Sequence, residues 1–199
     1  MSTTAPSLDR QSFAELLTRA TAAPGLDIEE AEAAFLSVVE GHLTDVQAAA
    51  LLIALRARGE TAAEVAGGVR ALRRAMIPVR AGEGAPVVDT CGTGGGKVTT
   101  FNISTAAALV AAAGGARIAK HGNRSYTSRC GSADVLEALG VRIELSAQAM
   151  ADVLEEAGIV FMFAPLLHPA MQHATPVRRE LGLPTVLNLL GPLTNPAGA

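Results

Sequence analysis

The chain has 199 residues, of which 49% are hydrophobic and 18% are charged, and its formal net charge is −3 at pH 7. This composition is typical of a globular protein of one domain, or of one domain with a small companion. The negative charge argues against a protein that binds duplex nucleic acid, because no basic excess exists to neutralise phosphates.

Three features of the sequence bear on its compartment. The first ten residues, MSTTAPSLDR, lack a cationic stretch followed by an apolar run, so no signal peptide is expected. The longest apolar stretches are interrupted by Gly, Arg or Lys before they reach the length of a membrane span. Cys91 and Cys130 are the only cysteines and lack metal-ligand spacing, which indicates a reducing compartment without a designed disulfide. We therefore expect a soluble cytoplasmic protein that has no contact with a membrane.

The first eighty residues predict four short amphipathic helices. Three pairs of residues have the spacing of a capping box, in which a side-chain oxygen accepts from the backbone three residues later: Asp27 with Glu30, Thr44 with Gln47, and Thr61 with Glu64. Ala48, Leu51, Leu52 and Leu55 share one helical face. Such helices form either a small bundle or an oligomer surface, and the pattern leaves both open.

The pattern changes after residue 80, where short apolar runs begin to alternate with helices. Strands are expected at Val87–Val88, at 117–119 and at Ile159–Phe163, and this alternation predicts a parallel sheet. The helix expected after the second strand has Ser132 as its cap, with Leu136 and Leu139 facing inward. The expected fold class is α/β with a separate helical domain. An N-terminal helical bundle (1–80) is joined to a mainly parallel α/β sheet domain (81–168), here incomplete. A helical segment and connection (169–199) is expected to pack back on the helical domain.

A glycine-rich loop, GTGGG at 92–96, follows the first strand. Glycines there let backbone N–H groups approach an anion closely, and the next helix begins with hydroxyl and amide side chains. A glycine run alone is more often a tight turn. It is neither a Walker loop, because no Gly-Lys-Ser/Thr follows, nor a dinucleotide-binding turn.

A second polar loop, 120–128, follows the second strand and carries Lys120 and Arg124. The carboxyl ends of parallel strands lie along one edge, so the two loops should face each other. A basic turn can be merely solvated, but two such loops on one edge favour a polyphosphate ligand. Further along, the guanidinium of Arg178 could fork onto the carboxylate of an aromatic acid.

Six strings resemble those of the anthranilate phosphoribosyltransferases, in the same order along the chain. They are GTGG at 92–95, TFNIST at 100–105, KHGNR at 120–124, GSADVLEALG at 131–140, HPAM at 168–171 and NLLGPLTNP at 188–196. The resemblance implies a glycosyltransferase family 3 or nucleoside phosphorylase-like fold and a homodimer formed through the helical domain. It also implies transfer of the phosphoribosyl group of phosphoribosyl pyrophosphate (PRPP) to anthranilate in tryptophan biosynthesis.

The resemblance also implies three sets of site residues. Anthranilate contacts fall on Gly92, Asn123 and Arg178, and Ser104 contacts the cofactor Mg²⁺. No residue is implied as a catalytic acid, base or nucleophile, because the reaction needs positioning and charge neutralisation. PRPP contacts fall on two loops and the helix starts that follow them: Gly92, Gly95, Gly96, Thr100, Asn102, Ile103, Ser104, Thr105, Lys120, His121, Gly122, Asn123, Arg124, Ser125, Tyr126, Thr127, Ser128 and Ser132.

The sequence departs from the family pattern at two points. Gly96 stands where the family loop usually has an aspartate, and Lys97 follows it. Family members also continue beyond this region with an acidic Asp-Glu pair that binds Mg²⁺, so the 199 residues alone are expected to be inactive. Two other functions stay open: an enzyme like the pyrimidine nucleoside phosphorylases, and a non-catalytic relative kept for binding or assembly.

Overall fold

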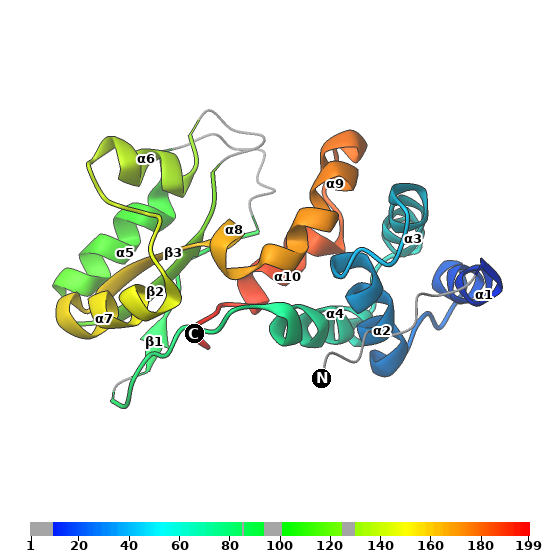
Figure 1. Cartoon of the computed structure of the whole chain (residues 1–199), viewed down its shortest axis with the longest axis horizontal. Coiled ribbons are helices and arrows are strands. Elements are labelled where there is room, and N and C mark those ends of the chain that lie inside the picture. Colours follow the sequence, from blue (N-terminus) through cyan, green and yellow to red (C-terminus); the bar gives the residue numbers. More distant parts are fainter. Residues whose placement is uncertain (1–9, 85, 94–100, 125–129) are drawn as a thin grey trace. The chain divides into compact units, whose positions relative to one another are not determined.

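Four helices form the N-terminal part of the chain: α1 (Arg10–Thr21), α2 (Ile28–Val39), α3 (Asp45–Arg58) and α4 (Ala62–Ala75). The computed structural model describes residues 10–84, 86–93, 101–124 and 130–199 (Figure 1). All three predicted capping boxes are present, at the starts of α2, α3 and α4. The helical N-terminal domain is thereby confirmed.

The helices belong to one of two units into which the chain divides. The helical unit comprises Met1–Ala75 with Ala170–Leu190, and the sheet unit comprises Met76–Pro169 with Gly191–Ala199. The 3₁₀ helix η1 (Pro169–His173), α9 (Thr175–Leu181) and α10 (Val186–Leu193) follow the last strand. Within the helical unit α2 packs against α4, α1 against α3, and α3 against α9.

Large aliphatic and aromatic side chains form the core of the helical unit. Phe35, Leu51, Leu52, Leu55 and Leu190 are fully buried in one cluster. Burial of each such side chain contributes about 1.5–3 kcal/mol. The predicted face of α3 that carries Ala48 and the three leucines is therefore confirmed as the buried face.

Glu64 is a fully buried carboxylate at the start of α4. It pairs with the guanidinium of Arg58, and it accepts hydrogen bonds from the backbone N–H groups of Leu26 and Thr61, each at 2.9 Å. Burial by itself would raise the pKa of the Glu64 carboxyl, but the bonds from Arg58, Leu26 and Thr61 together hold this pKa below its ordinary value. Arg58 also donates to the carbonyl of Ala20, in the last turn of α1, at 3.0 Å, so the pair ties α3 and α4 to the end of α1.

We predict that Glu64→Gln destabilises the helical unit by about 3–5 kcal/mol, because it leaves the Arg58 charge largely buried without its counter-charge. Glu29→Gln is the matched control, since Glu29 forms an exposed pair with Arg70 and should cost less than about 1 kcal/mol. Urea unfolding at neutral pH measures both. The lowered pKa means that this stabilisation is present above the ordinary carboxyl pKa of 4.5 and is lost as the pH falls below it. Equal midpoints for the two variants would contradict the assignment.

Among its described residues, the sheet unit contains three parallel strands in the order β1 (Val87–Val88), β2 (Arg117–Gly122) and β3 (Ile159–Phe163). Val88 pairs with Ile118 across the first ladder, and Gly122 pairs with Phe163 at the end of the second. The predicted parallel α/β sheet is confirmed. Its carboxyl ends lie along one edge, so the segments after β1 and β2 leave the sheet on the same side.

Four helices accompany the sheet: α5 (Ile103–Ala113), α6 (Ser132–Ala138), α7 (Ala147–Ala157) and the short α8 (Ala164–Leu167). Alternate residues of β3 point to opposite faces. Phe161 and Phe163 belong to a cluster that includes Leu136 of α6, whereas Val160 and Met162 belong to one that includes Leu154 of α7. Figure 1 shows α5, α6 and α7 around the strands.

Several local predictions need correction. β2 runs to Gly122 and not to residue 119, because the partner strand β3 continues beside it and pairs with Lys120, His121 and Gly122. Ser132 is not a helix cap: it is the first residue of α6, and its hydroxyl donates to the Asn123 carbonyl at 3.3 Å. Leu139, expected to face inward, follows the end of α6 and is 67% exposed. No helix among the described residues is both long and apolar enough to cross a membrane.

Candidate functional site

Asp89 follows β1 directly and is the centre of a hydrogen-bond network at the carboxyl edge of the sheet. Its Oδ1 accepts from the backbone N–H of Cys91 at 3.0 Å and from that of His121 at 3.2 Å. Its Oδ2 accepts from the side-chain amide of Asn195 at 2.8 Å. One carboxylate therefore connects the segment after β1, the end of β2 and the C-terminal segment of the sheet unit.

Lys120 places a buried ammonium group beside this carboxylate. The residue is only 3% exposed, and its Nζ donates to Ser104 Oγ at 3.3 Å and to Thr90 Oγ1 at 3.4 Å. Burial lowers the pKa of Lys120, and the negative charge of Asp89 opposes that shift. Thr90 Oγ1 in turn donates to the Ser104 carbonyl at 2.8 Å, so the start of α5 is held against the end of β1.

Two buried histidines lie next to each other on the same side of the network. The ring centroids of His121 and His168 are 5.0 Å apart, and the Nε2 atom of each is buried without a hydrogen-bond partner in the described part of the chain. Burial, reinforced by repulsion from His121, lowers the pKa of His168 to about 4, and burial also lowers the pKa of His121. Both rings are therefore neutral at physiological pH.

The thiol of Cys91 is a poor nucleophile in this setting. Burial, followed by the hydrogen bond and negative charge of Asp89, raises its pKa to about 12. Because the thiolate is the reactive form of cysteine, the side chain stays unreactive at neutral pH. This agrees with a site that positions reactants and does not form a covalent intermediate through Cys91.

Beyond β2 the chain is held by α6. A Cβ atom at Gly122 would lie 2.4 Å from Ser132 Oγ and 2.6 Å from the Phe161 ring, so this close approach requires glycine. Arg124 is paired with Asp134 and Glu137 of α6, and its guanidinium lies 5.6 Å from the Phe163 ring centre. The hydrogen bonds that Arg124 donates to Glu137 are the main reason that the pKa of Arg124 is raised.

The structure brings part of the sequence-predicted site together. Ser104 and Lys120 are in contact, and Asn102, Ile103 and Thr105 lie at the start of α5. His121 and Gly122 are the last two residues of β2, and Asn123 and Arg124 follow it. Gly92 is exposed. Arg178 belongs to α9 of the helical unit, whereas Gly92 and Asn123 belong to the sheet unit. The remaining predicted residues lie outside the described part of the chain: Gly95, Gly96, Thr100, Ser125, Tyr126, Thr127 and Ser128.

The side chains at the sheet edge can be compared with the ligands that Mg²⁺ requires. Within the described residues no group of three or more His, Cys, Asp or Glu side chains could hold a metal by itself. Mg²⁺ often binds through one or two protein oxygens together with waters and substrate phosphates. Ser104 Oγ is a single protein oxygen, so it fits that mode and does not fit a cage made of protein ligands alone.

Sequence reasoning missed four members of the network: Asp89, Thr90, His168 and Asn195. Asp89 and Thr90 stand directly after an apolar strand, a position that could have indicated them. From the sequence, His168 has no role beyond its place in the HPAM string, and residues 169–199 are expected to form a helical segment and connection. No spacing rule relates Asn195 to Asp89, because 106 positions separate them.

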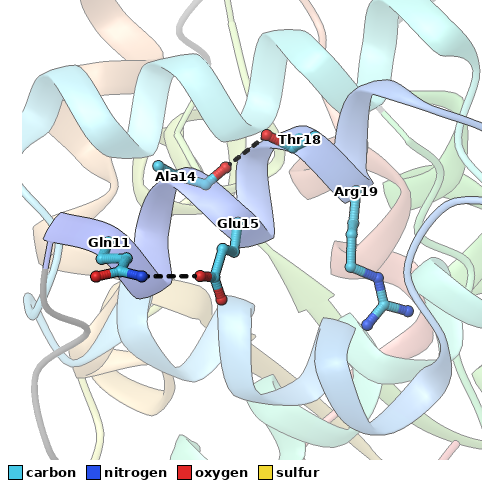
Figure 2. A pocket seen from close by; sticks show the side chains of 5 residues that line it. All are labelled: Gln11, Ala14, Glu15, Thr18 and Arg19. Carbon is cyan, nitrogen blue, oxygen red and sulfur yellow. Dashed lines mark hydrogen bonds between the residues drawn. The ribbon is translucent and has the colours of Figure 1, made fainter.

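A surface pocket on the helical unit shares no residue with this network. Figure 2 shows its lining, which comes from α1 alone: Gln11, Ala14, Glu15, Thr18 and Arg19. The polar groups there bond locally, with Gln11 donating to Glu15 and Thr18 donating to the Ala14 carbonyl. It contains neither buried charge nor a convergent set of donors, so the sheet edge is the better candidate site.

Two family models match the chain. The one described as the glycosyl transferase family, a/b domain, covers residues 84–199, and the one described as the helical bundle domain of that family covers residues 14–76. The chain belongs to this glycosyl transferase family. The fold class read from the sequence is that of the matched family, a helical domain and an α/β domain.

Curated relatives support the resemblance found in the sequence. The anthranilate phosphoribosyltransferase of Thermomicrobium roseum is 57% identical over 182 residues, which are 92% of this chain and 52% of the relative. That of Rubrobacter xylanophilus is 58% identical over 185 residues, which are 93% of this chain and 54% of the relative. The resemblance is confirmed, and the chain spans about half the length of the curated relatives it matches.

Solved structures agree with this result. Anthranilate phosphoribosyltransferase from Thermus thermophilus matches with a TM-score of 0.87 and 50% identity over 92% of this chain and 56% of that chain. The Saccharomyces cerevisiae enzyme in complex with PRPP and Mg matches with a TM-score of 0.80 and 27% identity, over 96% and 57%. The same enzyme in complex with 4-fluoroanthranilate matches with a TM-score of 0.77 and 26% identity, over 96% and 55%.

The buried histidines give a prediction for acid stability. The folded-state pKa of His168, about 4, lies below its ordinary value of 6.5, so the unfolded chain takes up the proton first as the pH falls. The stabilisation is complete above pH 6.5 and is lost between pH 6.5 and 4, to an extent of about 3 kcal/mol. His168→Gln should remove most of this pH dependence from urea unfolding, whereas the exposed His173→Gln should leave it intact. A His168→Gln variant with the wild-type pH dependence would rule out this origin.

Proposed function

We propose that this chain carries PRPP- and anthranilate-binding parts of an anthranilate phosphoribosyltransferase. The observation that carries the proposal is the buried Lys120 ammonium, set with the Thr90 and Ser104 hydroxyls at the carboxyl edge of a parallel sheet. A desolvated cation with neighbouring hydroxyl donors favours a polyphosphate ligand. Relatives that are 57% and 58% identical bear the enzyme's name, and this supports the choice of reaction.

The proposed reaction is a displacement at the anomeric carbon of PRPP. The anthranilate nitrogen forms a bond to this carbon, the bond to pyrophosphate breaks, and the amine loses a proton. Pyrophosphate leaves with its electron pair, so the protein has to stabilise a growing negative charge. The neutral His121 and His168 rings and the neutral Cys91 thiol add no competing charge, and the positive charge of Lys120 favours the leaving group.

The PRPP contacts are proposed to come from the two segments that follow β1 and β2. Ser104, beside Lys120, would also hold Mg²⁺, which supplies charge neutralisation for the pyrophosphate when it is bound. A structure of the yeast relative contains PRPP and Mg, and this supports the choice of ligand and cofactor. Arg124 has to leave its Asp134 and Glu137 partners before it can contact a phosphate.

The anthranilate contacts are proposed to come from Gly92, Asn123 and Arg178. A structure of the yeast relative contains 4-fluoroanthranilate, which supports an aromatic acid as the second substrate. Among the described residues Gly92 leaves open space, since a Cβ atom there would meet none of their atoms within 4 Å. Arg178, on α9, supplies the guanidinium that the substrate carboxylate requires.

We further propose that the enzyme is a cytoplasmic homodimer formed through the helical unit, where residues 1–80 form the dimerisation domain. In support, the unit exposes apolar side chains, with Val46 79%, Leu183 39% and Leu189 40% exposed. Sedimentation velocity over a range of concentrations tests the dimer, and a chain that stays monomeric throughout would count against it.

The first test of the function is binding of PRPP by the 199-residue chain in the presence of Mg²⁺. We predict that Lys120→Met weakens PRPP about 10- to 100-fold by calorimetry, because a charged hydrogen-bond partner is worth about 1.5–3 kcal/mol. Arg117→Met is the matched control: it removes one positive charge from the opposite end of β2, where Arg117 pairs with Glu155. It should leave PRPP affinity within about twofold.

The outcomes separate the competing functions. A chain that binds inorganic phosphate and a pyrimidine nucleoside in preference to PRPP would indicate a phosphorylase, and a chain that binds none of these would indicate an assembly module. We expect weak PRPP binding without loss of anthranilate fluorescence over time, since the resemblance places a Mg²⁺-binding acidic pair outside these 199 residues. Turnover at the rate of a full-length relative would refute that expectation.

The anthranilate assignment is tested on the PRPP-saturated chain. We predict that Arg178→Ala weakens anthranilate about 10- to 100-fold, because a charge-assisted contact to the carboxylate is lost. Arg179→Ala is the control, since Arg179 is the next residue of α9 and is exposed. Titration of anthranilate fluorescence measures both variants, and equal affinities would remove Arg178 from the site.

A further inference from the structure

Asn195 is a buried amide whose three hydrogen bonds all go to the sheet unit. The residue is 1% exposed, and its Nδ2 donates to Asp89 Oδ2 at 2.8 Å and to the Ala119 carbonyl at 2.9 Å. Its Oδ1 accepts from the Ala197 backbone N–H at 2.8 Å. Both donor hydrogens of the amide and its oxygen are therefore engaged, and its orientation is fixed.

The hydrogen bond from Asn195 to Asp89 also affects two other residues, because it fixes the orientation of the Asp89 carboxylate. With Oδ2 held by Asn195, the other oxygen of Asp89 faces the backbone N–H groups of Cys91 and His121. Cys91 leads directly into the glycine-rich segment, and His121 precedes the residues that continue beyond β2. Rotation of this carboxylate would release both backbones together, because they share a single acceptor atom.

The rest of the C-terminal segment supports this arrangement. His121 is hydrogen-bonded to the backbone of Gly191, and His168 to the backbone of Thr194. The Val79 N–H donates to the Pro196 carbonyl at 3.0 Å. Residues 191–196 are thus held by several hydrogen bonds to other parts of the sheet unit. The side chain of Asn195 is therefore fixed in its position beside Asp89.

We propose that Asn195 is a positioning residue for the phosphate-binding site. Through Asp89 it fixes the backbones of Cys91, after β1, and of His121, near the end of β2, relative to each other. Asn195 contacts no substrate in this proposal, and its effect on affinity passes through the carboxylate. The inference rests on the proposed function for its ligand, PRPP. The coupling between the two backbones is independent of that ligand and can be measured without it.

The experiment compares Asn195→Ala with Asn188→Ala in the 199-residue chain. Asn188 is a matched control because it also makes a side-chain bond to backbone, from Thr185 N–H at 3.1 Å, but it lies in the helical unit. Amide hydrogen exchange is followed by NMR at Cys91 and His121, with Ile118 as reference, since its N–H bonds to the Gly158 carbonyl. Calorimetry with PRPP and Mg²⁺ gives the affinity of each variant.

We expect Asn195→Ala to speed exchange at both Cys91 and His121 by at least about tenfold, with Ile118 unchanged, because both bonds weaken when the carboxylate rotates. PRPP affinity should fall by at least about tenfold in the same variant. Asn188→Ala should change neither quantity. Exchange that stays at the wild-type rate, or that rises equally at Ile118, would overturn the positioning role, since the second result is general destabilisation.

A wild-type chain that binds no PRPP would refute the proposed function, while the exchange rates would still decide the positioning role.

Discussion

The hydrogen bonds of the Asp89 carboxylate are the constraint on which the rest of the sheet edge depends. In a parallel sheet the segments that follow neighbouring strands leave on the same side, but nothing in the strand ladders fixes how those segments are placed relative to each other. A carboxylate can accept several hydrogen bonds at once, and Asp89 uses this capacity to hold Cys91, His121 and Asn195. Lys120, one residue before His121, is held in β2 by its pairing with Phe161 of β3.

Much of the architecture could be predicted because it depends on local patterns. The three capping boxes and the buried face of α3 follow from spacings of three and four residues, and the alternation of strands with helices was enough to predict parallel pairing. The predictions fail where a contact with a residue from another part of the chain determines the local structure. β2 extends to Gly122 because β3 continues beside it, and Ser132 bonds to the Asn123 carbonyl in place of capping its own helix. Neither partner is apparent from the local sequence.

The candidate site likewise contains some residues that could be predicted from the sequence and others that could not. Lys120 and Ser104 could be named from the resemblance, and the structure gives their contact. The groups around them could not be named, because His168 and Asn195 reach the site from positions that are far from β1 along the chain. Glu64 is similar: its capping-box partner Thr61 was predicted, but its burial against Arg58 depends on the segment that contains Leu26.

The distribution of charge at the sheet edge has one further consequence for chemistry. Burial disfavours the charged forms of Lys120, His121, His168 and Cys91 alike. The negative charge of Asp89 opposes this effect at Lys120 and at His121. Asp89 opposes the loss of the Lys120 proton, whereas the same carboxylate raises the pKa of Cys91 and so keeps that thiol neutral. A single negative charge therefore preserves one cation and suppresses one competing nucleophile. An anionic leaving group is stabilised by such a site, and a covalent intermediate on Cys91 is disfavoured, because the field that favours the ammonium also disfavours the thiolate.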